Sequence, residues 1–152
     1  MRLEIEGFKA KMSGFFSVIY PSVGTDNAAI DKFGSELLPI WEAMAAKTSE
    51  GKWLFGTQEP TLLDVNVAPF LEILYLWQKG VMSNVTDRLE LATKAPNLIR
   101  YVEMWQAHPL VNPHHMRQKA ANAHWARSRG WEKGVKCQLS TAVLEDVFED
   151  QS

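Results

Sequence analysis

A strong helix-start signal stands in the middle of the chain, in front of a segment that is apolar on almost every side. Residues 59–70 read EPTLLDVNVAPF, in which Thr61 is followed three positions later by Asp64. At a helix N-terminus the Thr61 hydroxyl can accept from the Asp64 N–H, while the Asp64 carboxylate accepts from the Thr61 N–H. Between Asp64 and Trp77 only Asn66 and Glu72 are strongly polar. A helix that is apolar nearly all round is buried, so we expect a central helix with a structural capping box, Thr61 and Asp64.

A catalytic role for the Asp64 carboxylate is the alternative to this structural one. A capping aspartate is already engaged by backbone donors, and its charge is stabilised by the positive end of the helix dipole. We therefore assign Asp64 to structure and name no catalytic residue in the chain.

The segments around the central helix carry apolar residues at helical spacing and no convincing alternation of period two. The spacing predicts helices over residues 2–20, from about 26 to 47, from 84 to 93, from about 96 to 107 and from 113 to 129. Pro39 lies inside the second of these and should bend or split it. We read WLFGTQ, residues 53–58, as a buried connector and not as a strand. The prediction is an all-α protein, a helical bundle of six or seven helices.

Composition excludes several classes of protein. The 152 residues suit one domain, and the formal net charge of −2 gives no overall attraction to nucleic acid or anionic membranes. The single cysteine, Cys137, rules out an internal disulfide framework. No apolar run is long enough to span a bilayer, and the charged N-terminal residues do not resemble a signal peptide. We expect a cytoplasmic protein.

Two stretches of the sequence resemble one known family. Trp53-Leu54-Phe55-Gly56, followed by Pro60-Thr61-Leu62-Leu63-Asp64 and Ala68-Pro69-Phe70, resembles the C-terminal, all-helical domain of the cytosolic glutathione transferases. APNLIRYVEMWQAHPLV, residues 95–111, is similar to the segment that leads to the last helix of that domain. The resemblance covers about residues 1–130 and implies the fold of the family, with the Thr-x-x-Asp box as a folding determinant of the core helix.

In that family an N-terminal thioredoxin-like domain holds glutathione and supplies the catalytic Tyr, Ser or Cys. Nothing in residues 1–152 matches that domain or its catalytic position. The resemblance therefore implies the helical half of a glutathione-transferase-like protein, inactive by itself and without a cofactor, with glutathione as co-substrate only beside a partner domain. The alternative is a non-catalytic protein–protein interaction module in a larger assembly, a role that relatives of this domain have.

The first predicted helix, residues 2–20, is the candidate for a ligand pocket. The resemblance implies that it lines the site for the hydrophobic co-substrate, and Met and aromatic side chains suit such a site. Our candidates are Met12, Phe16 and Tyr20, and core packing is the alternative for the same residues. Without a partner domain this apolar face would be exposed, which implies a homodimer or a partner protein that covers it.

The C-terminal part separates into a basic and an acidic segment. Residues 114–136 hold six bases and one acid, whereas residues 137–152 hold four acids and no base. We expect a helical domain over residues 1–136 and an acidic amphipathic tail over 137–152. Trp125 and Trp131 among the bases admit nucleic-acid binding, but we favour a solvated helix whose tryptophans pack inward. A further possibility is that the acidic tail docks on the basic helix.

The four histidines raise the question of a metal site. His114 and His115 are adjacent, so on a helix their side chains point to different faces, and no acid lies at ligand spacing between them. We predict no metal site.

Overall fold

The computed structural model describes residues 6–7, 27–48, 52–78, 80, 83–113 and 117–128. Seven helices lie in these ranges: α2 (Asn27–Glu36), α3 (Leu38–Ala46), α4 (Leu62–Gln78), α5 (Ser83–Leu89), α6 (Leu91–Lys94), α7 (Pro96–Ala107) and α8 (Gln118–Ser128). Glu6 and Gly7 are also helical. The described residues contain no strand, so the predicted all-α bundle of six or seven helices is confirmed.

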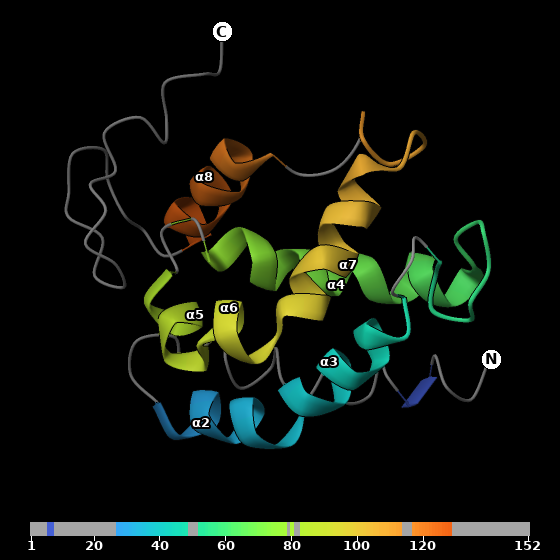
Figure 1. The fold of residues 1–152 in the computed structure, drawn as a ribbon. Coiled ribbons are helices and arrows are strands. Elements are labelled where there is room, and N and C mark those ends of the chain that lie inside the picture. The colour runs from blue at the N-terminus through green and yellow to red at the C-terminus, as the bar shows by residue number, and fades with distance from the viewer. Residues whose placement is uncertain are drawn as a thin grey trace, which may run out of the picture.

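Helix α4 runs through the middle of the bundle (Figure 1). α7 packs against both α3 and α4, α5 packs against α4, and α2 contacts both α3 and α5. Along α4 the side chains of Val67, Ala68, Leu71 and Leu74 are completely buried, and Trp77 is almost so. The nearly all-round apolar surface of this segment is therefore explained by neighbours on several sides, as the sequence predicted.

Pro39 divides the predicted helix of residues 26 to 47 into two. α2 ends at Glu36, Leu37 forms a turn, and α3 starts at Leu38 with Pro39 in its first turn. A proline is tolerated there because the first backbone N–H groups of a helix have no partner within it. The result is a split with little loss of hydrogen bonding, and Trp41 of α3 and Phe33 of α2 still meet, with ring centroids 5.1 Å apart.

Two of the predicted helix boundaries are wrong. The helix expected over residues 84–93 begins at Ser83 and is divided at Glu90, whose φ of 52° is left-handed. That conformation usually falls to glycine or asparagine, so a glutamate gives no sequence signal for it. The last predicted helix begins not at Pro113, which lies in a turn, but at Gln118.

The connector between α3 and α4 is irregular, as expected. The Trp53 N–H donates to the Thr57 carbonyl at 2.9 Å, and the Gly56 N–H donates to the Trp53 carbonyl at 2.7 Å. Gly56 has φ of 72°, a conformation that glycine adopts without penalty. This tight turn buries Trp53 and Leu54 and leaves Phe55 exposed.

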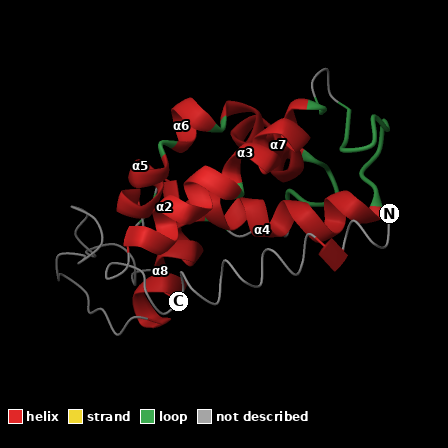
Figure 2. Ribbon diagram, turned by 90° about the horizontal axis from the view of Figure 1, so that it is seen from below, coloured by secondary structure: helices red, strands yellow, loops and turns green. Residues whose placement is uncertain are grey.

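Figure 2 shows helices and loops only among the described parts, with the connector and the turns after α7 at the same end of the molecule. None of the described helices is both long enough and apolar enough to cross a membrane. The expected division into residues 1–136 and 137–152 falls outside the described residues and stays a prediction.

Candidate functional site

The carboxylate of Asp64 joins three segments at the start of α4. Its Oδ2 accepts from the Thr61 N–H at 2.8 Å and from the Thr61 hydroxyl at 2.6 Å. Its Oδ1 accepts from the Leu54 N–H at 3.1 Å and from the Tyr101 hydroxyl at 3.0 Å. Asp64 is completely buried, so these donors replace water around the carboxylate.

The arrangement differs in one respect from a simple capping box. The Asp64 carboxylate accepts from the Thr61 N–H, as the sequence led us to expect. The Thr61 hydroxyl, which we expected to accept from the Asp64 N–H, donates to the carboxylate. The connector and α7 also reach this carboxylate, through Leu54 and Tyr101, and neither contact is indicated by the Thr-x-x-Asp spacing. Asp64 therefore holds together the connector, α4 and α7, in addition to starting a helix.

The environment of Tyr101 fixes the state of its hydroxyl. Burial raises the pKa of Tyr101 far above its ordinary value, and the negative charge of Asp64 and the hydrogen bond to it raise it further. The phenol therefore stays protonated and donates to Asp64. Tyr75 is similarly engaged, since its hydroxyl donates to the Glu103 carboxylate at 3.1 Å.

Aromatic rings surround the connector on the side of α7. The Trp53 ring lies edge-on to Tyr101 and Trp105, each at 6.2 Å between centroids, and to His108 at 5.6 Å. The Nε2 of His108 lies 3.5 Å from a carboxylate oxygen of Glu59 in the connector. The connector and the turn that follows α7 are thus neighbours in space.

This end of the molecule carries exposed apolar side chains. Leu62 and Val65 in the first turn of α4 are 60% and 51% exposed. Phe55 in the connector is 45% exposed, and Leu110 in the turns after α7 is 80% exposed. We call these four residues the apolar end. The remaining exposed large hydrophobic residue of the described parts, Ile40, lies on α3.

A shallow groove of about 430 Å³ lies on another face, between α2 and α3 on one side and α6 and α7 on the other. Glu42 on its wall is already engaged. Its Oε1 accepts from the Asn97 N–H at 3.1 Å and from the Asn97 side-chain amide, and its Oε2 accepts from the Leu98 N–H at 2.9 Å. Ala95, the residue before α7, provides no side-chain cap, so Glu42 of α3 caps α7 from outside.

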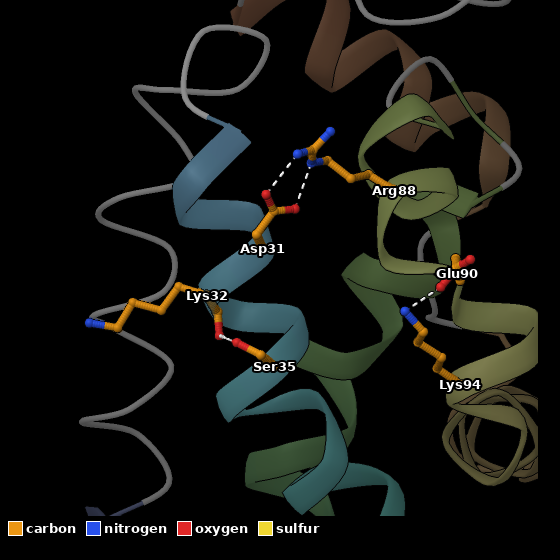
Figure 3. A network of polar contacts seen from close by, with 6 residues as sticks. All are labelled: Asp31, Lys32, Ser35, Arg88, Glu90 and Lys94. Carbon is orange, nitrogen blue, oxygen red and sulfur yellow. Dashed lines mark hydrogen bonds and ion pairs between the residues drawn. The ribbon is translucent and has the colours of Figure 1, made fainter.

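Two exposed ion pairs lie on α2, α5 and α6 (Figure 3). The Arg88 guanidinium of α5 contacts both carboxylate oxygens of Asp31 on α2, each at 2.6 Å. This contact holds the pKa of Asp31 below its ordinary value. Lys94 pairs with Glu90 one turn earlier. In contrast to the apolar end, this is a typical solvated protein surface.

Helix α8 is anchored on the C-terminal end of α4. The Trp125 ring packs edge-on against Trp77 at 5.4 Å, and the Gln118 side chain donates to the Leu76 carbonyl at 2.8 Å. Trp125 is buried, which agrees with a solvated basic helix whose tryptophan packs inward; Trp131 lies outside the described residues.

The pocket candidates Met12, Phe16 and Tyr20 all lie outside the described residues. A co-substrate site on the first helix therefore stays a prediction. In the part of the chain that the structure describes, no three His, Cys, Asp or Glu side chains are grouped so as to hold a metal ion.

The order of these elements, with a capped central helix after an aromatic connector, agrees with one family model. The model for the C-terminal domain of glutathione S-transferases matches residues 28–103. The chain belongs to the glutathione S-transferase C-terminal domain family. No curated protein and no solved structure matches the chain.

The matched part of this glutathione transferase C-terminal domain runs from α2 through most of α7. It includes Thr61, Asp64 and Tyr101, so the polar contacts at the start of α4 lie inside the family match. The resemblance drawn from the connector and the Thr-x-x-Asp box is confirmed. Leu110 and α8 lie beyond the match.

Proposed function

We propose that this chain is the hydrophobic co-substrate-binding half of a glutathione-transferase-like protein and is not catalytic by itself. The observation that carries the proposal is the state of Tyr75 and Tyr101, whose hydroxyls each donate to a carboxylate. A hydroxyl that activates glutathione must instead point to the thiol sulfur and stabilise its thiolate.

The chemistry of Tyr101 supports this division of labour. The Tyr101 hydroxyl donates its hydrogen to the buried Asp64 carboxylate. A glutathione thiolate placed at the same hydroxyl would be repelled by the negative charge of Asp64. Three threonine hydroxyls also donate hydrogen bonds within the domain. Thr48 donates to the Ala45 carbonyl, Thr57 to the Glu59 carbonyl and Thr61 to the Asp64 carboxylate. In this proposal the thiolate comes from a thioredoxin-like domain, and the helical domain provides the apolar site for the electrophile.

Met12, Phe16 and Tyr20 are the residues that we propose for that site. Flexible and aromatic side chains can adapt to flat apolar electrophiles of different shape. Glutathione enters as a co-substrate only beside the second domain, and no cofactor is required.

A conjugation assay tests the proposal. The purified chain with glutathione and 1-chloro-2,4-dinitrobenzene should react at the uncatalysed rate. A fluorescent apolar probe should nevertheless bind, and Met12→Ser with Phe16→Ser should weaken its binding. Ile40→Ser removes an exposed apolar side chain on α3 and is the matched control. Turnover by the chain alone, or equal loss of probe binding in the control, would contradict the proposal.

A second candidate is a non-catalytic assembly module, and the apolar end favours it. Phe55, Leu62, Val65 and Leu110 expose large apolar surfaces at one end of the described structure. Exposed apolar side chains gathered in one region are typical of protein–protein contacts. In this reading a homodimer or a partner protein covers them. Sedimentation of Leu62→Ser with Val65→Ser against the unmodified chain tests it, since an association through the apolar end should weaken.

A further inference from the structure

Helix α3 turns an apolar side to solvent. Three of its residues are buried in the bundle: Leu38, Trp41 and Ala45. Because an α-helix has 3.6 residues per turn, residues between these positions point the other way. Ile40 is 50% exposed, and Pro39 and Ala43 are exposed beside it. Ile40 and Ala43 are three positions apart within α3, so they are neighbours on the helix surface. We call Pro39, Ile40 and Ala43 the α3 face.

The groove of about 430 Å³ adjoins the α3 face. Its wall on α3 includes Pro39, Ala43 and Ala46. The two charged side chains on its walls are already paired, since Glu42 accepts from Asn97 and Lys94 contacts Glu90. The groove therefore offers mainly apolar contact, and an exposed side chain such as Ile40 of another molecule suits it.

Opposite charges stand at the two ends of α3. Glu36 is the last residue of α2, two positions before α3 begins, and Lys47 is the residue that follows α3. Both are exposed, and within the described ranges neither side chain has a hydrogen-bond or ion-pair partner. An antiparallel second copy of α3 brings the Glu36 end of each helix beside the Lys47 end of the other. A parallel copy would bring like charges together.

The α3 face also fits itself across a two-fold axis. The nine residues of α3 are about 14 Å long, so side chains at both ends can reach a copy that lies alongside. With the axis between Ile40 and Ala43, Ile40 of each copy faces the partner's Ala43 and enters the partner's groove. A two-fold interface uses the same surface twice, so each apolar contact and each ion pair occurs twice.

We propose that the α3 face is the contact surface for a second copy of this chain, packed antiparallel across a two-fold axis. Ile40 occupies the partner's groove, and Glu36 pairs with the partner's Lys47. One short helix buries less than the roughly 800 Å² per partner that is typical of stable complexes, so the dimer dissociates on dilution. The contact is independent of the proposed transferase role, and it leaves the apolar end available to a different partner.

Sedimentation of the full chain over a range of concentrations tests the proposal. The unmodified chain should change from monomer to dimer between about 1 μM and 1 mM. Ile40→Ser should raise the dissociation constant about tenfold or more, because an apolar side chain is lost from both symmetry-related contacts. Leu62→Ser with Val65→Ser is the matched control, since it removes exposed apolar side chains of the apolar end and should leave the dissociation constant unchanged.

Charge reversal tests the antiparallel arrangement. Glu36→Lys alone, or Lys47→Glu alone, places like charges together at both ends of the contact and should raise the dissociation constant about tenfold. The two changes in one chain restore opposite charges and should recover the affinity of the unmodified chain. Arg100→Glu reverses an exposed cation of α7 and should have no effect. Circular dichroism shows that the bundle is intact in each variant.

Three results would overturn the proposal. The first is a chain that stays monomeric up to about 1 mM. The second is a double charge reversal that fails to recover the affinity lost in the single variants. The third is an association that Leu62→Ser with Val65→Ser abolishes and Ile40→Ser leaves unchanged, which would assign the dimer to the apolar end.

Discussion

The hydroxyl of Tyr101 in α7 donates a hydrogen bond of 3.0 Å to the carboxylate of Asp64 in the first turn of α4. The two residues are 37 positions apart, and both are completely buried. The contact fastens one helix to the start of another at the point where Leu54 of the connector also donates to the same oxygen. A polar centre of this kind fixes the relative position of three segments, because each loses a partner if any one moves.

Replacement of Asp64 should destabilise the bundle severely. Asp64→Ala leaves the buried donors of Leu54 and Tyr101 and the half-buried donors of Thr61 without an acceptor. We therefore expect a loss of about 3 kcal/mol or more in the free energy of unfolding. Asp64→Asn should cost less, because its carbonyl oxygen can still accept. Urea denaturation followed by circular dichroism measures both. Asp31→Ala is the control, since its ion pair is exposed and should contribute little. Equal losses at positions 31 and 64 would contradict the structural role.

The raised pKa of Tyr101 predicts a dependence of stability on alkaline pH. In the unfolded chain the phenol ionises near its ordinary value of 10.0, whereas in the folded protein burial and Asp64 keep it protonated to higher pH. Because the pKa of Tyr101 is raised in the folded protein, its phenol contributes fully to the free energy of unfolding below pH 10. Above pH 10 this contribution is lost, by up to about 1.4 kcal/mol per pH unit.

Tyr101→Phe removes this titration, so the stability difference between the unmodified chain and the variant should shrink as the pH rises from 9 to 11. Thermal unfolding at several pH values measures it. Tyr75→Phe is the matched control, because its hydroxyl bonds to an exposed glutamate. If the stability difference between the unmodified chain and Tyr101→Phe stays constant from pH 9 to 11, the phenol ionises similarly in the folded and unfolded states.

Glu42 provides a cap for α7 across the bundle, and its loss should be visible. Glu42→Ala leaves the N–H groups of Asn97 and Leu98 without their acceptor, so we expect a loss of about 1–2 kcal/mol. Glu42→Gln retains an accepting oxygen and should recover part of it. Hydrogen exchange of the Asn97 and Leu98 amides should quicken in the alanine variant. Glu36→Ala, an exposed position on α2, should leave both amides unchanged.

The sequence predicted those parts of the fold that depend on local patterns. Three of these patterns are local, because each involves residues only a few positions apart. They are the capping signal at Thr61, the proline at position 39 and the apolar spacing of α7. The turn at Glu90 was missed because a left-handed glutamate depends on the packing around it and not on its own preference.

The contacts that matter most to the candidate site could be expected only in part. A buried tyrosine hydroxyl needs a hydrogen-bond acceptor, so the sequence indicates that Tyr101 has one. Ala95 precedes α7 and cannot cap it with its side chain, so another residue must provide the cap. The sequence does not say which carboxylates they are, because Asp64 and Glu42 lie 37 and 55 positions from their partners. Distances of that kind are set by the packing of helices and not by spacing along the chain.

Gly80 lies where α8 meets the end of α4, and a larger residue there should displace α8. A Cβ at this position would meet the Asn122 side-chain oxygen, with the Gln118 side-chain nitrogen at 2.6 Å and the Leu76 carbonyl oxygen at 2.9 Å. The two amide side chains can rotate away, but the backbone carbonyl cannot, so Gly80→Ala should break the hydrogen bond from Gln118 and loosen the Trp77–Trp125 contact. Tryptophan emission should shift to longer wavelength as Trp125 becomes exposed.

Gly56→Ala is the informative comparison, because its Cβ would meet no atom within 4 Å and the cost there comes from φ alone. That variant should lower stability without the shift, whereas an unshifted spectrum for Gly80→Ala would mean that α8 adjusts without leaving α4.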